Sequence, residues 1–253
     1  MKRYSLSVVK ITFSITFTVW FIALMVFSCR GRKEPPVQVN QSFSDKVVTS
    51  AHGFSINRKD DYSVVTITNP WQGADNISMS HYLVRKGFGL PEGIDSSQVI
   101  FVPVSRIICM SATHIGMILA LGEENSIIGL SVTGFVFSDE IIDRVTQGLI
   151  EEVGYESNIN QELIIKISPD LVMMYGIGSE SAGHVNKIKE LGINIMFNAD
   201  YLETDPLGKA EWIKLFGALY CKEELADSIF REEVKDYNQI RDYVIENSEE
   251  KPS

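Results

Sequence analysis

The sequence predicts an α/β protein: a Rossmann-like lobe built on a parallel sheet, preceded by a short antiparallel β segment and followed by one long helix. Three observations predict this fold. Short runs that are apolar throughout, such as residues 171–175, are typical of strands buried on both faces. Segments with apolar residues at helical spacing separate these runs. The charged stretch 222–246 keeps one apolar stripe along its length, which is typical of a single amphipathic helix.

The central stretch, 106–197, alternates between the two patterns. Thr113 is the expected N-cap of its first helix, and Gly122 and Gly192 are expected to end helices. Pro169 cannot continue the preceding helix and disfavours helical geometry at Ser168, so the chain should turn there. The expected strands are 106–110, 126–131, 171–175 and 193–197, and the expected helices are 114–121, 159–167 and 181–191.

The flanking stretches complete the expected fold. Alternating polar and apolar residues predict strands over 53–56, 62–68 and 81–84, and a further strand over 98–104 that leads into the parallel sheet. A helix is expected over 207–219, before the long one. The predicted divisions are 46–104 for the β segment of the lobe, 105–220 for the ligand-binding α/β lobe and 221–253 for a linking helix.

The N-terminus resembles a bacterial lipoprotein signal. Basic residues precede an apolar run, 11–27, which ends at Ser28 and Cys29. Residues 1–28 would be removed, Cys29 would carry lipid, and the polar residues 29–45 would form a tether. An uncleaved anchor helix is the alternative, because about 18 apolar residues can just span a bilayer. Either reading places most of the protein on the periplasmic or cell-surface side of a bacterial membrane.

Composition excludes several functional classes. The 253-residue chain has a net charge of -10 and no cluster of Lys and Arg after its first 33 residues, which argues against a nucleic-acid partner. No phosphate-binding glycine loop is present, and no histidine lies in a catalytic or metal-binding motif, so an enzyme is not expected. The lobe's cysteines, Cys109 and Cys221, have apolar neighbours and are expected to be buried free thiols rather than a disulfide.

Parallel sheets bind ligands beyond the carboxyl ends of their strands, and hydroxyl and aromatic residues follow the predicted strands here. Such residues suit a bulky, partly planar ligand. His114 is the one candidate metal ligand, the alternative being an exposed or hydrogen-bonded histidine in the first helical turn. Phe135 and Phe137 alternate, so one is expected in the core and the other at the ligand. The candidate ligand-binding residues are Ser111, Thr113, His114, Thr133, Phe135, Tyr155, Glu156 and Tyr175.

Several segments, in this order and spacing, resemble the substrate-binding proteins of ABC importers that take ferric siderophores, haem and cobalamin. They are 110–114, 127–131, 160–164, 167–172, 191–193 and 207–213. The resemblance implies a binding protein with two α/β lobes joined by a long helix, with no resident cofactor. It implies an iron chelate, haem or corrinoid as ligand, a transporter permease as partner and a lipid anchor in the membrane.

The resemblance also implies an acidic residue that docks the lobe onto the permease, and Glu180 is the nearest candidate; a charge complementing a helix N-terminus is the alternative. One lobe and the linking helix use up the chain, so we expect the N-terminal half of such a receptor. The expected function is therefore an extracytoplasmic solute-binding lipoprotein of an ABC importer. The alternative is a non-transporting envelope lipoprotein that uses the lobe as an interaction module.

Overall fold

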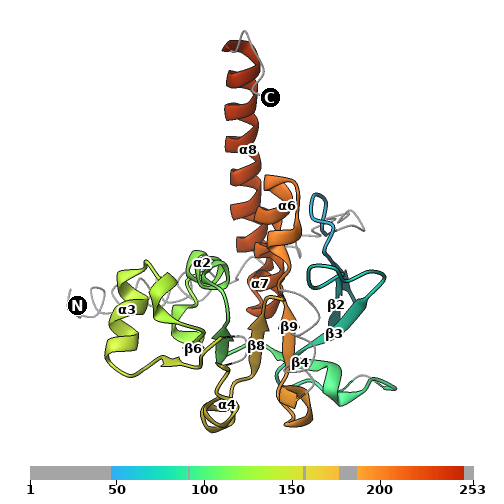
Figure 1. Ribbon diagram of the computed structural model, residues 1–253. Helices are drawn as coiled ribbons and strands as arrows, with labels where there is room; N and C mark the ends of the chain where they lie inside the picture. Colours follow the sequence, from blue (N-terminus) through green and yellow to red (C-terminus); the bar gives the residue numbers. More distant parts are fainter. Residues whose placement is uncertain (1–46, 91, 156–157, 177–186, 248–253) are drawn as a thin grey trace, which may run out of the picture. The chain divides into compact units, whose positions relative to one another are not determined.

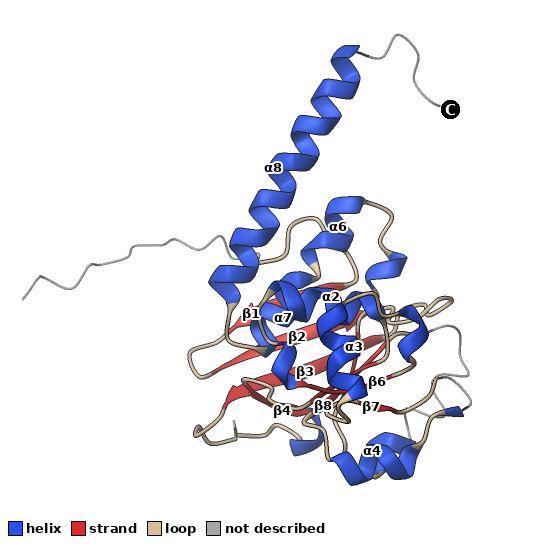
Figure 2. Ribbon diagram, turned by 90° about the vertical axis from the view of Figure 1, so that its left-hand side faces the viewer, coloured by secondary structure: helices blue, strands red, loops and turns tan. Residues whose placement is uncertain are grey.

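The computed structural model describes residues 47–90, 92–155, 158–176 and 187–247. Within these residues the chain forms two sheets with helices packed around them, which confirms the predicted α/β class (Figures 1 and 2). The first sheet has the strand order β1-β2-β3-β4, and its first two pairs are antiparallel. Its strands are β1 (Phe54–Arg58), β2 (Tyr62–Thr68), β3 (Ser78–Arg85) and β4 (Val99–Val102).

The last pair of this sheet departs from the prediction. β4 runs parallel to β3, with Tyr82 opposite Val99, so it completes the first sheet and does not lead into the second. Val99 and Ile100 are both buried, although they point to opposite sides of the strand. A strand with apolar side chains on both faces is most stable when both of its faces are covered, and the place beside β3 provides this.

The second sheet is the predicted parallel one. In the described residues it has the order β7-β6-β5-β8-β9, and every pair is parallel. Every residue of β5, β8 and β9 is buried, as expected of strands covered on both faces. Its strands are β5 (Ile107–Cys109), β6 (Ile127–Leu130), β7 (Glu151–Glu152), β8 (Leu171–Met174) and β9 (Ile195–Phe197).

Helices connect these strands and follow the last one. They are α2 (Ala112–Ala120), α3 (Asp139–Thr146), α4 (Gln161–Ile167), α6 (Pro206–Glu211), α7 (Ile213–Leu219) and α8 (Glu223–Asn247). The sequence did not indicate α3 or β7, because both are short and largely polar. The helix expected over 207–219 is divided at Trp212, whose ring is fully buried against Phe54 at 4.5 Å between centroids.

Local turn chemistry follows the sequence closely. Ser168 adopts the left-handed conformation (φ 45°) at the end of α4, directly before Pro169, and Gly122 and Gly192 also have positive φ, as predicted. The predicted cap of α2 was wrong: Ser111, rather than Thr113, precedes the helix, and its side chain accepts a hydrogen bond from the Thr113 N–H.

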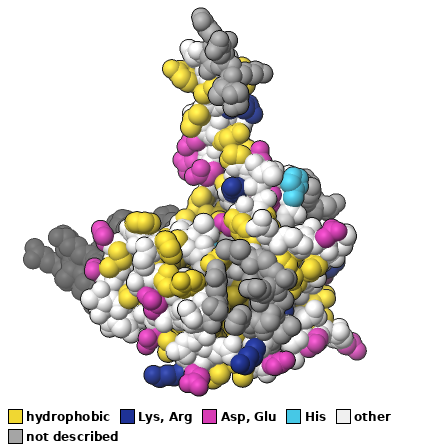
Figure 3. All heavy atoms as spheres, viewed as in Figure 1, with side chains coloured by type: hydrophobic (Ala, Val, Ile, Leu, Met, Phe, Trp, Pro, Cys, Tyr) yellow, Lys and Arg dark blue, Asp and Glu magenta, His cyan; other side chains and the backbone are white. Residues whose placement is uncertain are grey.

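The expected long helix is present as α8, but the expected apolar stripe is not buried along its whole length. Its first half packs on α6 and α7 through the buried side chains of Ala226 and Phe230. Residues 239–247 are exposed, and Figure 3 shows apolar side chains along this part of the helix. Ile240, Tyr243 and Ile245 are each about two thirds exposed.

Two thiols lie in the described residues, and both are free: Cys109 is buried, as predicted, and Cys221 is only half-buried. Within the described ranges, every helix is too short or too polar to cross a bilayer. The predicted signal peptide (1–28), Cys29, the tether up to residue 45, and residues 181–186 of the expected helix 181–191 lie outside the described residues.

Two buried carboxylates fix the segment that leads into β1. The Glu211 carboxylate accepts hydrogen bonds from the backbone N–H groups of Thr49 and Ala51, both at 2.9 Å, and from Lys214 Nζ at 2.8 Å. Glu203 Oε1 accepts from the backbone N–H groups of His52 (2.9 Å) and Gly53 (2.8 Å). Side chains of residues 203–214 therefore hold the first described residues, and we call this set of contacts the carboxylate clamp.

The clamp depends on a close approach at Gly53. A Cβ atom at this position would lie 2.7 Å from the Trp212 ring and 3.3 Å from Glu203 Oε1. Trp212 Nε1 itself donates to Glu203 Oε1 at 3.2 Å. Glycine lets the backbone reach the carboxylate without displacing the ring.

We predict that Glu211→Gln lowers the free energy of unfolding by about 3 kcal/mol near neutral pH, because it removes the buried partner of Lys214 and leaves only the half-exposed Asp227 carboxylate as its counter-charge. Chemical denaturation with urea measures this change. Glu233→Gln, at an exposed position on α8, is the matched control and should change stability by less than about 0.5 kcal/mol.

The effect of Glu211 should depend on pH. Burial acts to raise the pKa of Glu211, but the hydrogen bonds from Lys214 and from the backbone of Ala51, Ser50 and Thr49 outweigh it and hold the pKa below the ordinary value of 4.5. A lowered folded-state pKa gives stability that is complete above the ordinary pKa and is lost as the pH falls through the folded-state pKa. The difference between wild type and Glu211→Gln should therefore shrink on acidification; a difference that grows would contradict the clamp.

Candidate functional site

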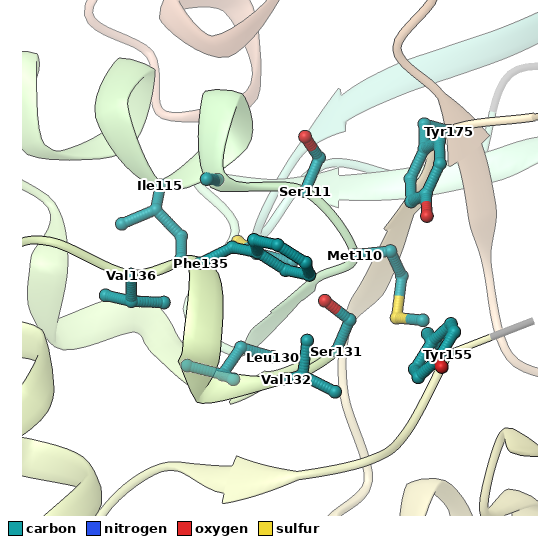
Figure 4. A pocket seen from close by; sticks show the side chains of 12 residues that line it. Met110, Ser111, Ile115, Leu130, Ser131, Val132, Phe135, Val136, Tyr155 and Tyr175 are labelled. Atoms are coloured by element: carbon teal, nitrogen blue, oxygen red, sulfur yellow. The ribbon is translucent and has the colours of Figure 1, made fainter.

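A pocket of about 210 Å³ lies at the carboxyl edge of the parallel sheet (Figure 4). Its walls come from the ends of β5, β6 and β8, the first turn of α2, and the loops after β6 and β7. This is the edge at which open parallel sheets bind ligands. The residues that line it are Cys109, Met110, Ser111, Ala112, Ile115, Leu130, Ser131, Val132, Phe135, Val136, Tyr155 and Tyr175.

The lining combines aromatic rings with hydroxyl groups. In Figure 4, Phe135 lies on one side of the pocket and Tyr155 and Tyr175 lie on the other, with the Ser131 hydroxyl between them. The side chains of Phe135 and Tyr155 are 70% and 47% exposed, so a ligand placed here would cover apolar surface that water now contacts. The hydroxyl groups can donate or accept hydrogen bonds and would fix the ligand's orientation.

The structure brings together four of the eight candidate ligand-binding residues on the pocket surface: Ser111, Phe135, Tyr155 and Tyr175. Two more stand beside it. Thr113 Oγ1 lies 3.1 Å from Ser111 Oγ, and Thr133 donates its N–H and its hydroxyl to Glu152, each at 3.0 Å. The Thr133–Glu152 contact ties the loop that carries Phe135 to the end of β7. Glu156 lies outside the described residues, as does Glu180.

His114 does not reach the pocket. Its side chain is fully buried, and its ring packs 6.2 Å from that of Phe216 on α7. Burial lowers its pKa to about 3, so the ring is neutral at physiological pH. The reason is helix register: α2 begins at Ala112, which places His114, Ile115 and Ile118 on the side that faces the core.

The expectation that either Phe135 or Phe137 enters the core was wrong. Phe135 is 70% exposed and Phe137 is 90% exposed, while Val136, between them, is buried. The chain forms a short 3-10 helix, η3 (Thr133–Phe135), here rather than a strand, so strict alternation of sides does not apply. Phe135 lines the pocket and Phe137 does not.

Sequence reasoning missed the end of β9. Asp200, in the 3-10 helix η5 (Asp200–Leu202), is buried and accepts a hydrogen bond from Thr113 in the first turn of α2. Burial raises the pKa of Asp200, and the hydrogen bond from Thr113 opposes that rise. Tyr201 donates its hydroxyl proton to the Gly176 carbonyl and so joins the ends of β9 and β8. The sequence could have identified Asp200 as a candidate site residue, because Asn198 to Asp200 directly follow an apolar strand.

Ser131 and Met110 were also missed, although each is the first residue after a strand. As for metals, within the described part of the chain no three His, Cys, Asp or Glu side chains gather in an arrangement that could hold an ion.

No protein-family model matches the chain. Over 149 residues it is 40% identical to an uncharacterized lipoprotein of Methanocaldococcus jannaschii, in an alignment that covers 56% of this chain and 35% of the relative. It is 28% identical over 169 residues to a second uncharacterized lipoprotein of the same organism, with 64% and 42% covered. The chain thus spans well under half the length of these curated relatives.

Similar solved structures include a possible iron-binding, periplasmic solute-binding protein from Staphylococcus epidermidis (TM-score 0.47, 22% identity, covering 58% of this chain and 54% of that one). A periplasmic vitamin B12 binding protein of Vibrio cholerae gives a TM-score of 0.39 at 20% identity, with 58% and 53% covered. A periplasmic heme binding protein from Pseudomonas aeruginosa gives 0.44 at 15% identity, with 56% and 47% covered. The chain matches about half the length of each.

Proposed function

We propose that this chain belongs to an extracytoplasmic solute-binding lipoprotein of an ABC importer, which captures an iron chelate, haem or corrinoid and delivers it to a membrane permease. One observation carries the proposal: exposed aromatic rings and hydroxyl groups converge on a pocket at the carboxyl edge of a parallel sheet. A large planar ligand needs such a surface, which offers apolar area together with a few orienting hydrogen-bonding groups.

The location outside the cytoplasm has separate support. Two relatives carry the name lipoprotein, and the N-terminal sequence of this chain has the basic, apolar and Ser28–Cys29 pattern of a lipoprotein signal. Both features favour a lipid-anchored protein on the outer side of a bacterial or archaeal membrane.

A second lobe would complete the site. The pocket opens to solvent through Phe135 and Tyr155, and the exposed part of α8 presents Ile240, Tyr243 and Ile245 without a covering element in the described residues. A lobe that followed α8 could bury both surfaces. In such a protein this chain alone would bind its ligand at least about a hundredfold more weakly, a loss of about 3 kcal/mol.

The first test compares two neighbouring phenylalanines. Phe135→Ala should weaken binding of cyanocobinamide, ferrioxamine B or haemin, whichever binds wild type, by about tenfold, because it removes a ring from the pocket. Phe137→Ala is the matched control and should change nothing, because that ring is 90% exposed and does not line the pocket. Isothermal titration calorimetry measures both; equal affinities for the two variants would contradict the site.

The lipid anchor is tested at Cys29. Expressed in a bacterium with radiolabelled palmitate, the wild-type chain should incorporate label and stay with the membrane fraction. Cys29→Ser should lose the label, because no thiol remains at this position to carry the lipid. Retention of residue 1 in the mature protein, seen by mass spectrometry, would instead support the uncleaved anchor helix.

Permease docking is tested at Glu180. Charge reversal, Glu180→Lys, should reduce uptake in a reconstituted transporter, because it replaces attraction to permease arginines by repulsion. Glu162→Lys is the control: Glu162 lies in the first turn of α4, before β8 rather than after it. Unchanged uptake for Glu180→Lys would remove the docking role.

A further inference from the structure

In the described residues, the segments that follow the five strands, at the carboxyl edge of the parallel sheet, lack basic side chains. These segments are 110–114, 131–138, 153–155, 158–160, 175–176 and 198–205, and none of them contains Lys or Arg. Their acidic residues are Asp200, Glu203 and Asp205; Glu203 belongs to the carboxylate clamp and Asp205 caps α6.

The pocket wall repeats this pattern. None of the described residues that line it carries a charge at neutral pH, and its polar side chains are the hydroxyl groups of serines and tyrosines. Two carboxylates contact residues next to the pocket: Glu152, which holds Thr133, and Asp200, which accepts from Thr113 and also interacts with the charge of Lys209 on α6.

One feature of this edge would ordinarily attract an anion, namely the N-terminus of α2, where the helix dipole is positive. Two of the chain's own groups already interact with its first turn. Ser111 Oγ accepts the Thr113 N–H at 3.3 Å, and the Asp200 carboxylate accepts a hydrogen bond from the Thr113 side chain. A ligand anion placed there would meet Asp200 as a like charge.

Cations lie at the other ends of the strands. Arg106 precedes β5 and donates through Nε to the Ser168 carbonyl at 3.1 Å, in the turn before β8. Lys166 is in the last turn of α4, and Lys189 precedes β9. These three basic side chains are thus separated from the pocket by the length of the strands.

We infer that the ligand of this pocket carries no net negative charge: its periphery is uncharged or cationic, and anionic chelates are rejected. This inference rests on the proposed function. A carboxylate placed against this wall would lose its water without gaining a cation from the described residues, so its desolvation would not be compensated there. Amide or ester groups can pair with the serine and tyrosine hydroxyls, and a cation can lie against the aromatic faces.

A matched pair of corrinoids tests the charge preference directly. Dicyanocobyrinic acid and its heptamethyl ester share one ring system and differ in whether the peripheral carboxylates are free or esterified. The full chain in detergent micelles should bind the ester at least about tenfold more tightly than the acid, measured by spectroscopic titration. An acid that binds as tightly as the ester, or more tightly, would overturn the inference and leave the proposed function standing.

Binding of neither corrinoid, and of neither cationic ferrioxamine B nor anionic ferric citrate, would overturn the proposed function and this inference with it. If only the two ferric chelates bind, the same charge preference is expected, so ferrioxamine B should bind more tightly than ferric citrate. Tighter binding of ferric citrate would contradict this inference but not the proposed function.

A charge introduced into the pocket should reverse the order. Ser131→Lys places an ammonium group in the pocket wall and should favour the anionic member of the pair. Ser96→Lys, at an exposed position in the first sheet's 3-10 segment η1 (Ser96–Gln98), is the matched control and should keep the wild-type preference. An unchanged preference in Ser131→Lys, with the fold intact by circular dichroism, would contradict the assignment.

Discussion

The carboxylate clamp is the interaction on which the described fold depends. Glu211 and Glu203 accept the backbone N–H groups that lead into β1, and Lys214 links the same place to Val47 O and to Asp227 of α8. The segment before β1 therefore meets residues about 150 to 160 positions later in the sequence at one buried ion pair. Because an unpaired buried charge is so costly, these contacts form together or fail together.

Much of the fold could be predicted because local chemistry and long-range packing agree. Pro169 and Ser168 turn the chain where the sequence indicates, and the fully apolar runs of β5 and β8 are buried on both faces. The parallel pairing of β4 could not be predicted, since an apolar run does not reveal which neighbour it pairs with. The helix break at Trp212 is likewise set by tertiary packing, because the Trp212 ring packs inward against Phe54. No local sequence pattern indicates this contact.

The site was predicted less fully than the fold. The location of the site at the carboxyl edge of the sheet could be predicted from the parallel topology. Residues directly after strands, such as Ser111 and Tyr175, could therefore be predicted to line it. The prediction for His114 was wrong because the helix begins two residues earlier than expected, which turns the His114 ring into the core. Asp200 was missed because its role depends on the first turn of α2, a contact between segments 87 positions apart in the sequence. Sequence patterns do not determine the exact helix register or the contacts between distant segments.

The internal neutralisation of the α2 N-terminus by Asp200 also bears on how a ligand arrives. A helix dipole that already has its counter-charge projects little field into solvent, and an uncharged ligand would feel little of it in any case. Its association rate would then be set by diffusion and by the shape of the opening, with almost no dependence on ionic strength. Capture of an uncharged ligand would therefore proceed equally well in dilute and in saline surroundings.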